Sequence, residues 1–486
     1  MRIDEPRRAW VAVLLLTACG GTLRFVTLDS QSFWLDELAT VSLLDRGFGE
    51  MVDGIRETEA TPYLYYVLAW PWARVFGLGE VGLRSLSAVV GTCAVPVSYA
   101  AGAALCSRRV GVVVAALVAV HPFLVWYSQE ARSYSLLVLL GACIVLFLGR
   151  ALRAPRRGDL ALWALASSLA IATHYFAVFL VAGAAAWLLA RYPARREAVA
   201  AFVLPAAVLA AHLPLVDAQR GNGETVGDTS LLSRVVGTPK ALVVGYSFPG
   251  EIAGSVLAAA LVAAGLALVV IRAGPHEQRG ALVGGTLALA VVAVPIGFAL
   301  VGNDYLTARN VILAVVPGAI CVATGFAANR LGLAAAAALA VLLLAVTLAV
   351  TLDTGYGRTD WRGVAKELEL SGMERAIVVT PYLSRSLWSP YLTGVDEPAG
   401  SRVRVGEIAV VGLATEGGFS GGRVRPPDLD PRPAPPGFSL VGTERTPTFV
   451  LYRYRAGVPT EVSTDTLAGM RLAEQQPGLL LQQPAR

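Results

Sequence analysis

The feature that most constrains the fold is a succession of long apolar runs, rich in Ala, Val and Leu, that fills most of the chain before Thr351. Each run approaches the roughly 20 apolar residues that an α-helix needs to cross about 30 Å of hydrocarbon. The 486 residues are 55% hydrophobic and only 15% charged, which excludes an ordinary soluble protein. The runs lack the alternation of membrane β-strands, so they predict a polytopic bundle of transmembrane helices, all-α in class.

Arginines between the runs predict how the helices cross the membrane. They cluster after alternate runs, as at Arg108-Arg109 and from Arg150 to Arg157. With the N-terminus inside, the positive-inside rule gives about 11 spans and places the region after residue 352 outside. The expected spans are residues 9–28, 83–105, 110–127, 133–148, 160–172, 176–190, 198–215, 252–271, 281–301, 311–327 and 331–352. These arginines account for the net charge of +5, so no nucleic-acid partner is expected.

Residues 63–76 leave one ambiguity in this topology. The segment, YLYYVLAWPWARVF, is apolar enough to suggest a further span, but counting it would invert every arginine-rich loop that follows. Its tyrosines and tryptophans, together with Pro71 and Arg74, favour a helix that lies in the membrane interface. We therefore expect interfacial helices beside the spans.

The composition changes after residue 352, and this change predicts the domain organisation. An amphipathic helix is expected from Asp360 to Leu370, and strands over 376–380, 403–413 and 448–454, separated by Gly/Pro-rich turns. Residues 423–436 are read as a Pro-rich linker or loop. We expect a transmembrane catalytic domain over 1–352, a small extracytoplasmic α/β domain over 353–458, and a disordered tail over 459–486, which shows no packing pattern.

Two adjacent carboxylates, Asp36 and Glu37, follow the first apolar run. Carboxylates beside a membrane exit are costly to place in hydrocarbon, so they must lie at the interface or in a wet cavity. Apolar residues around them recur with helical spacing, which predicts a helix lying flat on the bilayer. One interpretation is that the two acids merely cap this surface helix. The other is that they mark a reaction centre.

The other polar residues favour the reaction centre, because they differ between the two sides of the predicted bundle. The internal ends of the predicted spans carry mostly arginine. The external ends carry Asp36 and Glu37 together with Arg84, Glu130, Arg132, His174, Tyr305 and Arg309. Such a set suits transfer from a lipid phosphate to a hydroxyl. A carboxylate can deprotonate the nucleophile, and cations can stabilise the departing phosphate.

Several motifs resemble one known family. They are Trp34-Leu35-Asp36-Glu37, Thr61-Pro62-Tyr63-Leu64-Tyr65-Tyr66, and the segments 83–88, 122–134 and 305–317. They look like signatures of the GT-C class of polyprenyl-phosphate-dependent membrane glycosyltransferases, close to the family 39 protein mannosyltransferases and the aminoarabinose transferases. This sequence departs from the family at Thr61, where proline is usual, at His174, where lysine is common, and at Asn310, where tyrosine is usual.

The resemblance implies roles for these residues. Asp36 would be the catalytic base, supported by Glu37, and Glu130 would bind the acceptor or a metal. The remaining candidates for the donor phosphate and sugar are Arg84, Arg132, His174, Tyr305 and Arg309. A divalent ion between Asp36 and Glu130 stays open because some relatives use one and others do not. The four histidines do not have the spacing of a zinc site.

The expected function is therefore an inverting glycosyltransferase in the plasma (inner) membrane, with its active site outside the cytoplasm. It would move a sugar, mannose-like by family likeness alone, from a polyprenyl-phosphate monosaccharide to a hydroxyl of a glycan, lipid or protein. The main alternative is a membrane transporter or lipid flippase, which predicts internal repeats and ionisable groups near the bilayer midplane. A non-enzymatic scaffold would leave the paired external acids unexplained.

Overall fold

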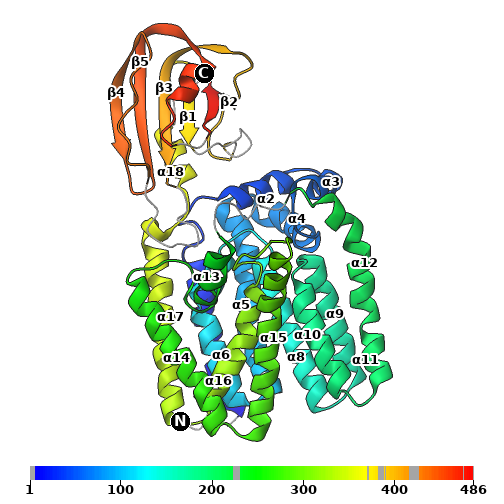
Figure 1. The fold of residues 1–486 in the computed structure, drawn as a ribbon. Coiled ribbons are helices and arrows are strands. Elements are labelled where there is room, and N and C mark those ends of the chain that lie inside the picture. Colours follow the sequence, from blue (N-terminus) through cyan, green and yellow to red (C-terminus); the bar gives the residue numbers. More distant parts are fainter. Residues whose placement is uncertain are drawn as a thin grey trace. The chain divides into compact units, whose positions relative to one another are not determined.

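The chain is described by a computed structural model, which covers residues 6–222, 230–368, 371–380, 388, 390–414, 426–473 and 476–484 (Figure 1). Its residues separate into two compact units. The helical unit consists of Met1–Leu28 and Leu43–Ala349, and the sheet unit of Asp29–Ser42 and Val350–Arg486.

The helical unit contains α-helices and one short 3₁₀ turn in its described part. Two helices, α2 (Leu35–Asp45) and α17 (Arg330–Leu352), run across the division between the units. The others are α1 (Pro6–Phe25), α3 (Phe48–Thr58), α4 (Leu64–Phe76), α5 (Glu80–Leu105), α6 (Arg108–Val120), α7 (Pro122–Ser128), α8 (Tyr134–Arg153), α9 (Arg157–Thr173), α10 (Ala177–Arg191), α11 (Arg195–Ala201), α12 (Val203–Ala218), α13 (Leu231–Val244), α14 (Glu251–Arg272), α15 (Pro275–Leu300), η1 (Ile312–Ala314) and α16 (Val315–Ala327).

Among the described residues, 7 helices are long and apolar enough to cross a membrane. They are α1, α5, α8, the continuous α11–α12 segment, α14, α15 and α17. The pair α6 and α7 adds an eighth if it is one span, bent by 58° at His121. Two shorter apolar helices, α10 and α16, fall below this length. The chain is thus an integral membrane protein. The total of about 11 spans remains a prediction from the sequence.

Helix α4 covers the segment whose placement was ambiguous. Its 13 residues, with Pro71 inside, extend for about 20 Å, because an α-helix rises 1.5 Å per residue. That length is well short of the roughly 30 Å of a bilayer core. The length of α4 therefore favours the interfacial interpretation over a further span.

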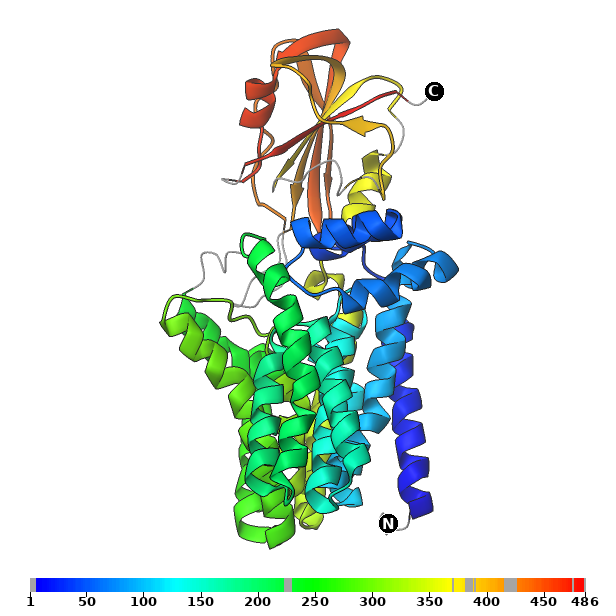
Figure 2. The same cartoon turned by 90° about the vertical axis from the view of Figure 1, so that its right-hand side faces the viewer.

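The core of the helical unit is built around α5, which packs against α1, α6 and α8. Figure 2 shows α1, in dark blue, beside the lighter blue α5. Helices α14, α15 and α16 form a second group, and α9 packs between α8 and α12. Small residues allow close approach: a Cβ on Gly325 would lie 1.8 Å from the carbonyl oxygen of Gly265. These packings bring the start of α5, the α7–α8 connection and the end of α9 to one end of the bundle.

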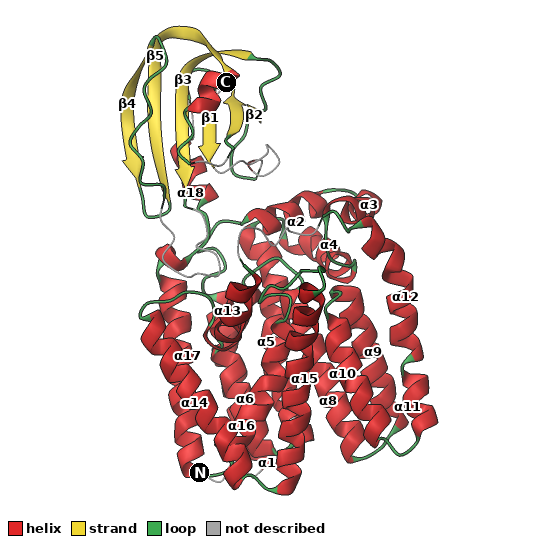
Figure 3. Ribbon diagram, viewed as in Figure 1, coloured by secondary structure: helices red, strands yellow, loops and turns green. Residues whose placement is uncertain are grey.

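The sheet unit holds all the strands of the described residues, drawn yellow in Figure 3. They are β1 (Arg375–Thr380), β2 (Val395–Asp396), β3 (Arg402–Leu413), β4 (Phe438–Arg445), β5 (Phe449–Ser463) and β6 (Gly478–Gln482), with η2 (Thr354–Tyr356), α18 (Trp361–Leu368) and α20 (Thr464–Gly469) beside them. The sheet order is β2-β6-β1-β3-β5-β4. Among the strand pairs that the structure describes, only β1 and β3 are parallel. Strand β1 is buried along its whole length, as its run of β-branched residues predicts.

The expectation of a disordered tail over 459–486 is wrong for the described part of that segment. Strand β5 continues to Ser463, α20 follows, and β6 pairs antiparallel with β1, from Arg375–Gln482 to Val379–Gly478. The short apolar stretch Leu479-Leu480-Leu481 is therefore an inner strand of the sheet. A run this brief gives no periodic signal, and its burial depends on a strand a hundred residues earlier in the chain. Residues 423–425 of the expected linker lie outside the described residues.

The segment between α1 and α2 belongs to the sheet unit. The expected domain boundary at residue 352 assigns this segment to the transmembrane domain. The Ser32 hydroxyl donates to the Thr359 carbonyl at 2.9 Å and accepts from the Trp361 N–H at 3.0 Å. The backbone N–H of Phe33 donates to the Tyr391 hydroxyl at 2.7 Å. These contacts join the segment just before Asp36 to the start of the C-terminal region.

Candidate functional site

Asp36 lies in the first turn of α2, which begins at Leu35. A carboxylate at this position is stabilised by the partial positive charge of the helix N-terminus. The side chain of Asp36 is half-buried, and its backbone carbonyl accepts from the Thr40 hydroxyl at 3.1 Å. The structure therefore places the proposed base at the start of a helix, as the spacing of its apolar neighbours predicts.

Glu37, in contrast, is fully buried and forms an ion pair. Its Oε2 accepts from Nη1 of Arg358 at 3.2 Å and from the backbone N–H of Trp34 at 3.3 Å. The Arg358 guanidinium also lies over the Trp34 ring, 5.1 Å from its centroid. Glu37 thus caps α2 and holds it to the segment after α17, which is the capping role that the sequence also allowed. The sequence did not predict this role for Arg358, which lies just before the helix expected from Asp360 to Leu370.

Arg132 has a carboxylate partner that the sequence did not predict. Its two terminal nitrogens donate to the two oxygens of Glu59, each at 3.0 Å, and Nη1 also donates to the Tyr66 hydroxyl at 2.9 Å. Both side chains of the pair are more than nine-tenths buried. Because a bidentate carboxylate occupies its guanidinium, Arg132 fits the role of a structural anchor better than the expected role of a phosphate ligand.

Glu59 is held from a second side, which explains how the anchor is built. The Asn222 amide donates to the carbonyls of Glu57 and Glu59 at 2.7 and 3.2 Å. The Gln219 amide donates to the carbonyls of Ile55 and Thr61 at 2.9 and 3.2 Å. The end of α12 therefore caps the last carbonyls of α3, and Arg132 fixes the segment from α3 to α4 to the α7–α8 connection.

His174 belongs to a chain of ring contacts that we call the aromatic cluster: Phe123, Tyr127, Tyr134, His174 and Tyr246. Successive ring centroids lie 5.4 Å apart for Tyr246–Phe123, 4.9 Å for Phe123–Tyr127, 4.7 Å for Tyr127–Tyr134 and 6.1 Å for Tyr134–His174. The hydroxyls of Tyr127 and Tyr246 share a hydrogen bond of 2.7 Å. Residues from four separate segments thus form one packed group.

The charge of His174 is settled by its surroundings. Burial lowers the pKa of His174 to about 3, and the positive charges of Arg132 and Arg309 act in the same direction. The backbone N–H of Phe176 donates to Nδ1 at 3.2 Å, which requires that this nitrogen carry no proton. His174 is therefore a neutral imidazole at pH 7 with its proton on Nε2, and it cannot replace the charge of the lysine that is common in the family.

Glu130 and Arg309 lie close enough to the aromatic cluster to act on it electrostatically. Burial raises the pKa of the Tyr246 hydroxyl, Glu130 raises it further, and Arg309 opposes the rise. Arg309 also acts on His174, as does Arg132. Of the residues predicted from the sequence, Glu130, Arg132, His174 and Arg309 are therefore brought together.

Arg84 and Tyr305 are placed differently. Arg84 is buried and donates to the Leu28 carbonyl at 2.8 Å, so it contacts the chain just beyond α1. Ser87, one turn further along α5, donates to the Arg132 carbonyl at 3.3 Å, so Arg84 lies at the same end of the bundle. The Tyr305 side chain is 45% exposed. Asn310 closes the loop by donating to the Tyr305 carbonyl at 2.9 Å.

The loop that carries Tyr305 and Arg309 is anchored by an ion pair that the sequence reasoning also missed. Arg234, buried in α13, donates to both carboxylate oxygens of Asp304, with Nη1 and Oδ1 2.8 Å apart, and to the Leu306 carbonyl at 2.9 Å. Oδ1 also accepts from the Leu306 N–H at 3.2 Å. The pair closes the turn before Leu306 and Ala308, which are fully buried.

The Arg234–Asp304 pair predicts a pH dependence of stability. Its hydrogen bonds hold the pKa of Asp304 below the ordinary value, so the stabilisation is fully present above the unfolded-state pKa of about 3.9 and is lost as pH falls through the folded-state pKa. We expect the thermal midpoint of the wild type to fall more between pH 6 and pH 3 than that of Asp304→Asn. Equal pH profiles of the two proteins, measured by tryptophan fluorescence in detergent, would contradict this role.

The described residues contain no group of three or more His, Cys, Asp or Glu side chains that could hold a metal ion.

Comparison with known proteins supports the resemblance seen in the motifs. Residues 60–216 match the family model described as dolichyl-phosphate-mannose-protein mannosyltransferase. That stretch includes Arg84, Glu130, Arg132 and His174 but neither Asp36 nor Arg309. No curated protein sequence matches the chain.

The fold is similar to that of a solved membrane protein, ArnT. The crystal structure of ArnT from Cupriavidus metallidurans bound to undecaprenyl phosphate matches with a TM-score of 0.55 and 14% identity, over 91% of this chain and 98% of that one. The apo structure of the same protein matches with a TM-score of 0.47 and 18% identity, over 66% of this chain and 60% of that one. AglB, an oligosaccharyltransferase from Archaeoglobus fulgidus, matches with a TM-score of 0.47 and 14% identity, over 75% of this chain and 58% of that one. In the last two alignments the chain spans less than two thirds of the relative's length. The resemblance to the GT-C class is confirmed.

Proposed function

We propose that this protein is an inverting membrane glycosyltransferase that moves a sugar from a polyprenyl-phosphate monosaccharide to an acceptor hydroxyl. The acceptor oxygen attacks C1 of the sugar, and the bond from C1 to the phosphate oxygen breaks. The acceptor's proton passes to Asp36, and the polyprenyl phosphate leaves. The leaving phosphate is a weak base, so no strong general acid is required.

The observation that carries the proposal is the gathering of Glu130 and Arg309 beside the aromatic cluster. Arg309 is a permanent cation next to a neutral histidine, which suits the phosphate of the donor. Glu130, buried at the same place, suits hydroxyl groups of the acceptor or sugar. Within this proposal Arg132 and Glu37 hold the structure, Arg84 and Tyr305 border the donor, and His174 donates a single hydrogen bond.

The proposal extends to the setting of the reaction. About 11 spans with the N-terminus inside would place Asp36, the ends of α7 and α9 and the sheet unit outside the cytoplasm. Within the proposal, the protein lies in the plasma (inner) membrane. The acceptor class is a glycan, lipid or protein. No observation on the described residues favours the transporter alternative.

The direct test is a donor screen. Purified full-length protein in nanodiscs would be incubated with a panel of polyprenyl-phosphate sugars, including mannose, arabinose and aminoarabinose. Each reaction would contain a Ser/Thr-rich peptide, an oligosaccharide or a glycolipid as acceptor. We expect one pair to release free polyprenyl phosphate and form a glycoside of inverted configuration. Release at background rates for every pair, with donors that bind the protein, would overturn the proposal.

Arg309 gives a more specific prediction. Arg309→Met should weaken binding of undecaprenyl phosphate by about 10-fold or more, because a hydrogen bond to a charged group contributes about 1.5–3 kcal/mol. Arg309→Lys, which keeps the charge but not the fork geometry, should lose less. Binding can be measured by native mass spectrometry in detergent, with Arg330→Met as a control at an exposed helix start. Equal affinity of Arg309→Met and the control would exclude this role.

A further inference from the structure

Arg24 is a buried cation inside a predicted span, and its role is not explained by the proposed chemistry. It lies near the end of α1 and is only 1% exposed. Its Nε donates to the Ser128 hydroxyl at 3.1 Å, Nη1 to the Gly20 and Ala119 carbonyls at 2.9 and 3.0 Å, and Nη2 to the Val118 carbonyl at 3.2 Å. In the described part of the chain its hydrogen-bond partners are therefore carbonyls and a hydroxyl, without a carboxylate.

The break between α6 and α7 explains why these carbonyls need a partner. Pro122 begins α7 and has no N–H to donate to the Val118 carbonyl, and the bend of 58° turns the following amides away from the axis of α6. Carbonyls left unpaired in a membrane interior are costly. The guanidinium of Arg24 satisfies them, and the negative end of the α6 dipole stabilises its charge.

Gln129 makes the reciprocal contact. It follows α7, and its Nε2 donates to the Leu23 and Arg24 carbonyls at 3.1 and 3.3 Å and to the Thr27 hydroxyl at 2.7 Å. These acceptors lie at the C-terminal end of α1, where carbonyls lack partners within the helix. Arg24 thus caps the broken helix from α1, and Gln129 caps α1 from the connection that leads directly to Glu130.

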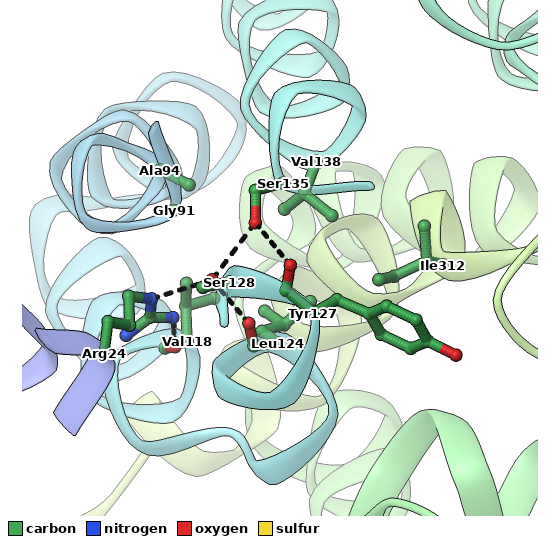
Figure 4. A pocket seen from close by; sticks show the side chains of 10 residues that line it. All are labelled: Arg24, Gly91, Ala94, Val118, Leu124, Tyr127, Ser128, Ser135, Val138 and Ile312. Atoms are coloured by element: carbon green, nitrogen blue, oxygen red, sulfur yellow. Dashed lines mark hydrogen bonds between the residues drawn. The ribbon is translucent and has the colours of Figure 1, made fainter. Parts of the chain in front are cut away.

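Figure 4 shows the side chains around the hydrogen bond between Arg24 and Ser128. The Ser128 hydroxyl accepts a hydrogen bond from Nε of Arg24 and another from the Ser135 hydroxyl at 3.2 Å. It donates to the Leu124 carbonyl at 2.6 Å. A Cβ on Gly91 of α5 would lie 2.2 Å from the Ser128 hydroxyl. The cavity beside these groups leaves only ≈ 10 Å³ open to the centre of a water molecule, room for about one water. Its size favours a rigid joint over a ligand site.

We infer that Arg24 and Gln129 are positioning residues, which exchange hydrogen bonds between α1 and the α7–α8 connection and thereby hold Glu130 beside the aromatic cluster. The inference rests on the proposed function for the meaning of that position. Its structural part stands independently, because it predicts which backbone becomes mobile when either side chain is changed.

The test uses the full-length protein in detergent, with Gln129→Leu, Gln129→Glu and Arg24→Met. Gln129→Glu keeps the shape of the side chain but cannot donate to the Leu23 and Arg24 carbonyls, so it should behave like the Leu variant. We expect hydrogen exchange over residues 127–133 to become at least fivefold faster in all three, with α8 to α10 unchanged. With an active donor and acceptor pair, kcat should fall about 10-fold while KM for the donor stays within twofold.

Thr347→Val is the matched control. The Thr347 hydroxyl donates to the Val120 carbonyl at 2.8 Å, so this isosteric change also removes a buried hydrogen bond to the end of α6. It should leave hydrogen exchange over residues 127–133 and kcat at wild-type values. Wild-type exchange in both Gln129 variants, or an equal increase in Thr347→Val, would overturn the inference. If Arg24→Met does not fold, the Gln129 variants decide. If no donor is turned over, the proposed function fails while the exchange experiment still tests the joint.

Discussion

Replacing Asp36 by asparagine should reduce sugar transfer by about a thousandfold, within the range of roughly 10²–10⁴ that a positioned general base contributes. The change removes the group proposed to accept the acceptor's proton but keeps the size of the side chain. Because Asp36 is only half-buried and lies in the first turn of α2, folding should be nearly unaffected. The measurement is the rate of polyprenyl phosphate release at saturating donor, with undecaprenyl phosphate binding followed in parallel.

Asp45→Asn is a suitable control because Asp45 is exposed at the other end of the same helix. It should turn over at the wild-type rate. Binding of undecaprenyl phosphate should be preserved in Asp36→Asn, since its effect lies in the transition state. Turnover of Asp36→Asn within a few-fold of the control would remove Asp36 from the mechanism, whatever the donor proves to be.

Truncating Glu59 to alanine should have the largest effect on stability. It leaves the Arg132 guanidinium buried without its bidentate carboxylate, and breaking a buried ion pair costs about 3–5 kcal/mol. We expect the thermal midpoint to fall by about 5 °C or more. The double variant Glu59→Gln/Arg132→Gln should recover part of this loss, because neither side then carries an isolated charge. Thermal unfolding in detergent, followed by fluorescence, measures all three proteins.

The exposed pair Arg157–Glu197 supplies the control. Arg157 is 86% exposed, so Glu197→Gln should cost less than about 1 kcal/mol and leave the midpoint unchanged. Arg132→Met should in turn lower stability while undecaprenyl phosphate binding changes less than twofold. Strong loss of that binding in Arg132→Met, with an unchanged midpoint, would restore Arg132 as a phosphate ligand and contradict the anchor.

The candidate site could be predicted in part because some of its signals are local. Asp36 begins a helix whose apolar spacing is readable over ten residues, and Glu130 and His174 follow apolar runs whose lengths indicate helix ends. Partners are not local. Arg132 and Glu59 are 73 residues apart in the chain, and Arg358 and Glu37 are 321 apart. Nothing in the composition around one member indicates the other, so the same arginine can be read as a ligand or as an anchor.

The sequence by itself determined that this is a membrane protein of apolar helices, because burial in lipid requires long runs and internal backbone hydrogen bonds. It also determined which acids and arginines lie near helix ends. Only the tertiary structure decided that Arg132 is paired with Glu59 and Glu37 with Arg358. It also decided that His174 is neutral and that Leu479 to Leu481 form an inner strand. The reason is physical: the charge and availability of a side chain depend on burial and on neighbours brought from distant parts of the chain, and these arise only when helices and strands pack.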